Sequence, residues 1–262
     1  PQAISNIVWA YATAEEPHPK MFKKLANHIV ALDNLALARF DPQALSNIVL
    51  AYAKVEESHP KLYEKVADHI VALDNLALAR FDPQALSNIV LAYTTAQESH
   101  LQLFKKVADH IVSLDLKQFN GQDFANTVWA YATAEEPHPN LFEKVADHIA
   151  SLDNLDKFKP QAISNTVWAY ATAEESHPKL LRKLADTAIK RQHEFIPQHI
   201  ANFLWASATI GQIDQNLFSS LTPSVKANLD EYNEQELANI AWAYAVVNVA
   251  TASVFDDKFL DV

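Results

Sequence analysis

The sequence predicts an all-α fold, a right-handed αα-superhelical solenoid of about six and a half helix-turn-helix repeats. Three observations predict it. An asparagine recurs every 37 to 41 residues, within the range of solenoid repeats. Prolines stand where helices would begin, and apolar residues follow them at helical spacing. The recurring asparagines are Asn6, Asn47, Asn88, Asn126, Asn165, Asn202 and Asn239.

The composition of the 262 residues fits this fold and excludes several function classes. Hydrophobic residues make up 49%, enough for a sizeable core. Only two glycines occur, Gly121 and Gly211, so Gly-rich nucleotide-binding loops are absent. The lack of cysteine excludes disulfides, thiolate zinc sites and cysteine nucleophiles. No apolar run reaches membrane-spanning length, so no membrane insertion is expected. The net charge of −11 disfavours a polyanionic partner.

Each repeat is expected to open with a helix of about 12 to 15 residues, as in "PQAISNIVWAYATA". Proline is tolerated in the first turn because its missing N–H is not needed there. The units start near residues 1, 42, 83, 121, 160, 197 and 234 and form a single solenoid domain over 1–262. We expect this domain to be a fragment of a longer protein. The helix-starting prolines are Pro1, Pro42, Pro83, Pro160 and Pro197.

A second helix is expected in each repeat, as in "PKMFKKLANHIVAL", and again begins at a proline. Connections such as "LDNLALARFD" then carry the chain to the next repeat. The final segment, "ASVFDDKFLDV" (252–262), is expected to begin a seventh second helix. The prolines that start second helices are Pro19, Pro60, Pro139 and Pro178.

Helical spacing assigns the faces of both helices. In the first helix of the first repeat, Ile4, Ile7, Val8 and Tyr11 share one side, which should pack on the second helix. In the second helix the residues expected to be buried are Phe22, Leu25, Ala26 and Ile29.

The side of the first helix opposite the apolar stripe carries a glutamine, an asparagine, a tryptophan or leucine, and most often a threonine. We call it the amide–tryptophan surface and expect it to line the concave groove of the solenoid. All five tryptophans of the chain lie on it. Its residues are Gln2, Asn6, Trp9, Thr13, Gln43, Asn47, Leu50, Lys54, Gln84, Asn88, Leu91, Thr95, Gln122, Asn126, Trp129, Thr133, Gln161, Asn165, Trp168, Thr172, Gln198, Asn202, Trp205, Thr209, Gln235, Asn239, Trp242 and Val246.

This surface has two interpretations. Aromatic rings at regular spacing stack nucleobases, and amide side chains bond base edges or backbone, which together suit single-stranded RNA. Alternatively, the amides form a structural ladder between helices and the tryptophans pack between them. Glutamine and asparagine occur in all seven units, so any RNA contact would be generic. Discrimination would depend on variable positions such as Thr13, Lys54 and Val246.

Other recurring residues favour structural roles. Two histidines in successive repeats of the set His28, His69, His110 and His148 should lie about 10 Å apart, too far to share a metal ion. A second set is expected at turns and helix caps: His18, His59, His100, His138 and His177. Lysines on the second helix are expected to pair with aspartates three residues later. These lysines are Lys24, Lys65, Lys106, Lys144 and Lys183, and the aspartates are Asp68, Asp109, Asp147 and Asp186.

No carboxylate pair, Ser/His/Asp set or metal-ligand spacing stands out from the repeat. We therefore expect a non-enzymatic protein with no catalytic residues, cofactor, bound metal or small-molecule substrate.

The motifs "SNIVWAYA", "ANTVWAYA", "ANFLWASA" and "ANIAWAYA", on a proline-started repeat, resemble the octotricopeptide repeat. They are especially similar to repeat arrays of algal and protist proteins that end in a RAP domain. FAST-kinase-like and pentatricopeptide proteins are more distantly similar. The resemblance covers essentially the whole chain and implies an αα-superhelix that binds RNA in a chloroplast or mitochondrion for transcript stabilisation, processing or translation. Because no RAP-like domain follows the repeats in this sequence, no nuclease-like activity is carried over.

We therefore predict a helical-repeat protein that binds single-stranded organellar RNA in its concave groove. The alternative is a protein–protein interaction scaffold that takes an extended peptide or helix in the same groove. A third interpretation is a structural subunit of a large organellar assembly. The location of charge discriminates between them: Lys and Arg lining the groove favour RNA, whereas a neutral or acidic groove favours a protein.

Overall fold

A computed structural model describes residues 1–14, 18–55, 59–136, 138–211 and 214–248. Within these residues the chain forms fifteen α-helices and three short 3₁₀ helices, and no strand. The predicted all-α fold is confirmed. The predicted start of a helix in 252–262 and parts of the "AEEPHP"-type turns, 15–17, 56–58 and 137, lie outside the described residues.

The repeat contains two main helices, as predicted. The first helices are α1 (Gln2–Thr13), α4 (Pro42–Lys54), α7 (Pro83–Thr95), α9 (Gly121–Thr133), α11 (Pro160–Thr172), α13 (Pro197–Thr209) and α15 (Glu234–Val247). The second helices are α2 (Pro19–Val30), α5 (Pro60–Ala72), α8 (Leu101–Ser113), α10 (Pro139–Ser151), α12 (Pro178–Lys190) and α14 (Gln215–Ala227).

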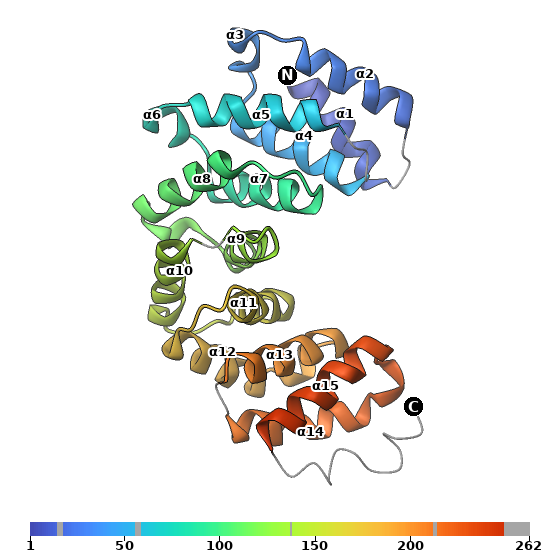
Figure 1. The fold of residues 1–262 in the computed structure, drawn as a ribbon, viewed down its shortest axis with the longest axis vertical. Helices are drawn as coiled ribbons and strands as arrows, with labels where there is room; N and C mark the ends of the chain where they lie inside the picture. Colours follow the sequence, from blue (N-terminus) through green and yellow to red (C-terminus); the bar gives the residue numbers. More distant parts are fainter. Residues whose placement is uncertain (15–17, 56–58, 137, 212–213, 249–262) are drawn as a thin grey trace. The chain divides into compact units, whose positions relative to one another are not determined.

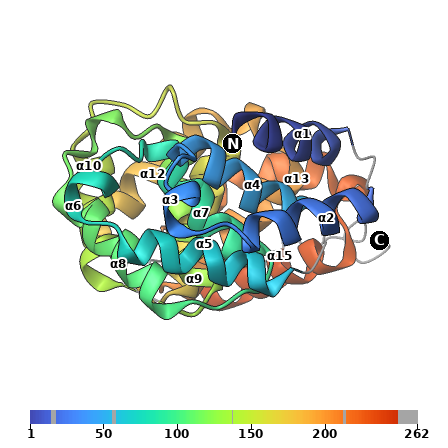
Figure 2. The same ribbon diagram turned by 90° about the horizontal axis from the view of Figure 1, so that it is seen from above.

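The chain divides into two compact units, Pro1–Leu141 and Phe142–Val262. In the first unit, α1, α4, α7 and α9 pack in sequence as one layer, and α2, α5 and α8 form a second layer (Figures 1 and 2). In the second unit, α11, α13 and α15 form one layer, and α12 packs on α14. Each unit therefore has the helix-pair stacking of an α-solenoid.

Side-chain caps mark the start of four of the first helices, α4, α7, α9 and α15. Asp41 precedes Pro42, and its carboxylate accepts a hydrogen bond of 2.6 Å from the Ala44 N–H. Where proline is missing, Asn120 and Asn233 form capping boxes at the start of α9 and α15. The helix α1 begins at Gln2, with Pro1 as its cap position rather than its first residue.

Most connections between repeats are partly helical, which the sequence analysis did not predict. They contain α3 (Asn34–Leu37), α6 (Asn75–Leu78) and the 3₁₀ helices η1 (Leu116–Gln118), η2 (Gln192–Glu194) and η3 (Leu229–Glu231). In five connections, a leucine and an aromatic residue three positions later are both buried, which anchors the connection. These pairs are Leu37 and Phe40, Leu78 and Phe81, Leu116 and Phe119, Leu155 and Phe158, and Leu229 and Tyr232.

A buried tyrosine ties each of five first helices to the second helix of the preceding repeat. The Tyr52 hydroxyl donates a 2.7 Å hydrogen bond to the Phe22 carbonyl, and the two rings meet edge to face with centroids 5.0 Å apart. The same bond and ring geometry recur in four further pairs: Tyr93 with Tyr63, Tyr131 with Phe104, Tyr170 with Phe142, and Tyr244 with Phe218.

The predicted packing of the apolar stripe needs one correction. Its tyrosine packs on the preceding repeat, and α1 is the first helix of this sequence. Consequently Ile7 is 43% and Tyr11 39% exposed, whereas the equivalent Ile48 and Tyr52 are fully buried. On the second helix, the predicted burial of Phe22, Ala26 and Ile29 is confirmed, whereas Leu25 is only half-buried.

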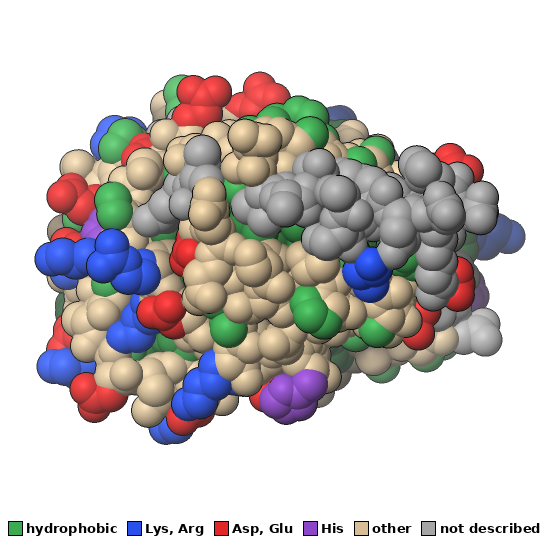
Figure 3. Space-filling view, turned by 90° about the horizontal axis from the view of Figure 1, so that it is seen from below, with side chains coloured by type: hydrophobic (Ala, Val, Ile, Leu, Met, Phe, Trp, Pro, Cys, Tyr) green, Lys and Arg blue, Asp and Glu red, His purple; other side chains and the backbone are tan. Residues whose placement is uncertain are grey.

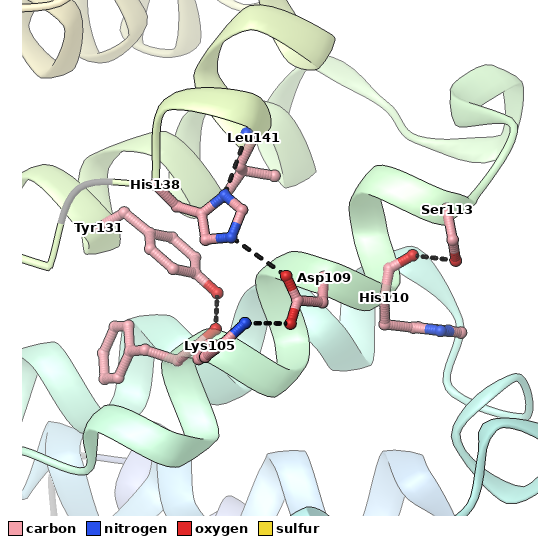
Figure 4. Close-up of polar contacts among 8 residues, drawn as sticks. Lys105, Asp109, His110, Ser113, Tyr131, His138 and Leu141 are labelled. Atoms are coloured by element: carbon pink, nitrogen blue, oxygen red, sulfur yellow. Dashed lines mark hydrogen bonds and ion pairs between the residues drawn. The ribbon is translucent and has the colours of Figure 1, made fainter.

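Histidines cap four second helices, as predicted. The His138 Nδ1 accepts a hydrogen bond from the Leu141 N–H, so the opposite nitrogen, Nε2, carries the proton and faces Asp109 Oδ1 at 3.2 Å (Figure 4). His177 lies against Asp147 in the same way, at 3.1 Å. The capping histidines are His18, His100, His138 and His177.

Asp109 therefore contacts the next repeat as well as its own helix. Asp109 accepts from Lys105, four residues earlier, at 2.7 Å, and not from Lys106 as predicted. This bond, together with that from His138, holds the pKa of Asp109 below its usual value. The predicted spacing was wrong here: Lys105 and Asp109 are both exposed on α8, whereas Lys106 is half-buried.

Candidate functional site

The amide–tryptophan surface is largely open to solvent. Its glutamines are exposed, except the half-buried Gln122. Its asparagines are half-buried, except the exposed Asn6 and the buried Asn88, which is 8% exposed. The fourth position of this surface, which Thr13 holds in the first repeat, is exposed in all seven repeats. The side chains at these positions are therefore accessible to a ligand to differing degrees.

The tryptophan position combines packing with exposure. Trp242 is 45% exposed and the other four tryptophans are half-buried, whereas Leu50, at the same position, is only 7% exposed. The rings of Trp168 and Trp205, on the neighbouring helices α11 and α13, have centroids 6.5 Å apart and planes at 32°. These two tryptophans of adjacent repeats thus lie side by side and keep part of their surface exposed.

The amides pair along one helix in three repeats. The Gln2 Nε2 donates to Asn6 Oδ1 at 3.0 Å, four residues away. The pair restrains both side chains and leaves the asparagine NH₂ group and the glutamine oxygen available for a ligand. The other two pairs are Gln122 with Asn126, at 2.6 Å, and Gln235 with Asn239, at 3.0 Å.

The fourth position holds hydroxyls and one cation. The Thr13 hydroxyl donates to the Trp9 carbonyl at 2.8 Å, and Thr209 bonds Trp205 in the same way at 2.9 Å. Lys54, which takes this place in α4, lies with its Nζ 4.6 Å from the centre of the Trp9 ring, a cation–π arrangement.

The surface is nearly free of charge. Lys54 is the single Lys or Arg within the seven first helices as the structure describes them. Their acidic residues are the buried Asp123 and, near the start of α15, Glu234 and Glu236. The space-filling view from the α14 and α15 end shows both signs of charge mainly toward the margins (Figure 3). The lysines and arginines of the other described helices lie on second helices, except Lys117 in η1, and none belongs to this surface.

The histidines of the second helices lie apart from this surface and differ in burial. His28 is exposed, while His69, His110 and His148 are half-buried. Burial lowers the pKa of both His69 and His110. The Nε2 atom of His110 is buried and has no hydrogen-bond partner among the described residues.

Replacing His110 with leucine is expected to reduce the acid sensitivity of the fold. The pKa of His110 is lower in the folded state than in the unfolded state. The contribution of His110 to stability is therefore fully present above the ordinary histidine pKa of about 6.5 and is lost as the pH falls below that value. Urea unfolding at pH 7.5 and pH 5.5 measures this loss, which should be smaller in His110→Leu. The matched control is His28→Leu. Equal losses in wild type and His110→Leu would contradict the prediction.

The described residues contain neither a metal-binding cluster nor a membrane-spanning helix. No three His, Asp or Glu side chains lie close enough together to hold a metal ion. In the same part of the chain, no helix has the length and apolar character needed to cross a bilayer.

Comparison with known protein families identifies the family of this chain. The model of a family described as RNA-editing substrate-binding complex 6 protein (RESC6) matches residues 1–257. No curated protein matches the chain. The family is named for a role with RNA, whereas the likeness to octotricopeptide and RAP-associated arrays stays a prediction. Because the match spans almost the whole sequence, the chain belongs to the RNA-editing substrate-binding complex 6 protein family.

Proposed function

We propose that the chain is a non-enzymatic scaffold subunit of an RNA-editing substrate-binding complex, and that its amide–tryptophan surface binds a segment of a partner protein. The family description supports membership of such a complex. The observation that carries the choice of a protein partner is the near absence of charge on the first helices.

Charge decides between the two classes of partner. Proteins that bind single-stranded nucleic acid combine aromatic side chains with a positively charged groove that follows the phosphates. This surface has the aromatic side chains but a single cation, Lys54, which is placed over Trp9. The chain as a whole carries −11. The cores of protein interfaces, in contrast, are enriched in tryptophan and depleted of charge.

An extended protein segment matches the functional groups of the surface. The exposed edges of the tryptophans would cover apolar side chains of the partner, with Trp242 the most accessible of the five. Asparagine NH₂ groups and glutamine oxygens would bond its backbone, since an amide offers both donors and acceptors. Such contacts are generic, in keeping with the uniformity of glutamine and asparagine along the repeats.

Single-stranded RNA is the second candidate. The family name, which refers to an RNA-editing substrate, and the side-by-side rings of Trp168 and Trp205 favour it. We also propose that the protein acts in an organelle, as the resemblance to octotricopeptide proteins implies. A chloroplast location has no support beyond that resemblance. We likewise propose that residues 1–262 form a single solenoid domain with a concave groove.

The variant Trp168→Ala/Trp205→Ala is expected to lose the partner. One interface tryptophan contributes about 2 kcal/mol or more to binding, roughly 30-fold in Kd, so the double variant should bind more weakly by at least that factor. The measurement is quantitative mass spectrometry of proteins that co-purify with the tagged chain from its own cells, with and without ribonuclease. We expect ribonuclease-resistant partners with the wild type and their loss with the variant.

The control is Leu35→Ala/Leu76→Ala, which removes two leucines that are 81% and 83% exposed on α3 and α6, away from the surface. It should retain the partners, and all three proteins should melt within a few degrees of one another. Homopolymer RNA binding is measured in parallel across a salt series. Ribonuclease-sensitive association, together with RNA binding that needs the two tryptophans, would overturn the protein-partner proposal in favour of RNA.

A further inference from the structure

One repeat lacks the tyrosine tie that joins the others. In α13 the position of the tyrosine is taken by Ser207, whose hydroxyl bonds back to the Phe203 carbonyl at 2.8 Å. Opposite it on α12, Leu181 stands where Phe142 stands on α10. The repeat before it has the complete arrangement: the Tyr170 hydroxyl donates to the Phe142 carbonyl at 2.6 Å, with ring centroids 5.1 Å apart.

A cavity of about 240 Å³ occupies this place. Aligned with the preceding repeat, three of its lining positions have lost ring volume: Ser207 for Tyr170, Leu181 for Phe142, and Asp214 for His177. The rest of the lining is Val167, Arg182, Ala185, Ile210 and Leu217. The cavity is therefore the space that aromatic rings fill one repeat earlier.

We propose that this cavity binds the side chain of a tyrosine presented by a partner protein. The proposal stands independently of the amide–tryptophan surface, since the cavity lies between α11, α12, α13 and α14 and shares no residue with that surface.

The size and lining of the cavity suit a phenol ring. A cavity of about 150 Å³ with apolar walls already binds benzene, so about 240 Å³ holds a ring with a hydroxyl and a methylene. Val167, Leu181 and Leu217 are buried and supply apolar walls.

Hydrogen bonding favours tyrosine over phenylalanine. The Leu181 carbonyl corresponds to the Phe142 carbonyl, which accepts the Tyr170 hydroxyl in addition to its place in the helix. A carbonyl oxygen has two lone pairs, so the same second bond is open to an incoming phenol. The lining also contains one charge of each sign, on the exposed Arg182 of α12 and the half-buried Asp214. These charges can bind polar groups of the partner that flank its tyrosine.

The test uses the full chain and the tripeptide acetyl-Gly-Tyr-Gly-amide as probe, with acetyl-Gly-Ala-Gly-amide and free p-cresol as comparisons. Binding is followed by methyl NMR shifts of Val167, Leu181 and Leu217. We expect saturable binding of p-cresol and of the tyrosine peptide in the millimolar range or tighter, and none of the alanine peptide. Binding of p-cresol without the tyrosine peptide would overturn the proposal, because the cavity would then admit only small free phenols.

Filling the cavity from within supplies the second measurement. Ser207→Tyr, or Ser207→Tyr/Leu181→Phe if the single variant folds poorly, should restore the tie, raise the melting temperature and abolish probe binding. The matched control is Ser219→Tyr, at an exposed serine on α14, which should bind the probe as the wild type does. Unchanged probe binding in a folded Ser207→Tyr protein, or no binding to the wild type, would refute the assignment.

Discussion

Tyr131→Ala is expected to lower the free energy of unfolding by about 3–5 kcal/mol, the cost of truncating a large buried aromatic side chain. Tyr131 is 1% exposed, and its ring meets Phe104 edge to face with centroids 5.2 Å apart. Its hydroxyl donates to the Phe104 carbonyl at 2.7 Å. The substitution therefore removes the ring, the bond and the link between α8 and α9 together.

Tyr131→Phe separates these contributions. It keeps the ring and removes only the hydroxyl, so the expected loss is about 1 kcal/mol, the net value of one hydrogen bond. Urea unfolding followed by circular dichroism measures both variants. Because neighbouring repeats of a solenoid stabilise one another, amide exchange should also accelerate in α8 and α9 before it does in α1. A loss below about 1 kcal/mol for Tyr131→Ala would contradict the role of the tyrosine as a tie between repeats.

The periodic part of the fold could be predicted from the sequence. The recurring asparagine and the prolines at helix starts placed the two main helices of each repeat, since both signals are local. Periodicity also identified which side of a first helix is apolar. It did not identify the neighbour that covers that side, because the contact between Tyr52 and Phe22 joins different repeats and depends on how the helix pairs stack.

The connections were missed for a different reason. A four-residue helix such as α3 has too few residues for a periodic pattern. Its signal is the pair Leu37 and Phe40, three residues apart and both buried, which recurs in most connections of the sequence. The capping histidines were predicted from their place at or before the start of a second helix, but their bonds to aspartates such as Asp109 required the distance between neighbouring second helices.

The candidate surface could be located from the sequence, but its chemical character could not be settled from the motif alone. Helical spacing placed glutamine, asparagine and tryptophan on one side of each first helix. The bond from Gln2 to Asn6 and the position of Lys54 over Trp9 appear only in the structure. The cavity beside Ser207 has a signal in the sequence, the change from "WAYA" to "WASA", but its volume depends on the simultaneous change at Leu181.

Arg191→Met is expected to lower the free energy of unfolding by about 2–4 kcal/mol, because hydrogen bonds from a charged group contribute about 1.5–3 kcal/mol each. Arg191 directly follows α12, and its side chain is 13% exposed. Its guanidinium donates through Nη1 to the Leu155 and Phe158 carbonyls, both at 2.9 Å. Glu194 accepts from its Nε and Nη2 at 3.0 and 2.7 Å and holds it in place.

The size of this effect follows from the connection that Arg191 contacts. Residues 152–159, between α10 and α11, contain no helix, although Leu155 and Phe158 are buried there. Their carbonyls accept from Arg191 in partly buried bonds, so losing the guanidinium removes a donor from both, although the Leu155 carbonyl still accepts from the Phe158 N–H. Arg191→Lys keeps the charge but cannot present the planar fork, and it should recover less than half of the loss. Lys190→Met, at the exposed neighbouring position, should change stability by less than about 0.5 kcal/mol. If Arg191→Met matches Lys190→Met in urea unfolding, the connection is held by its apolar pair alone, and the guanidinium contributes nothing measurable to the joining of these repeats.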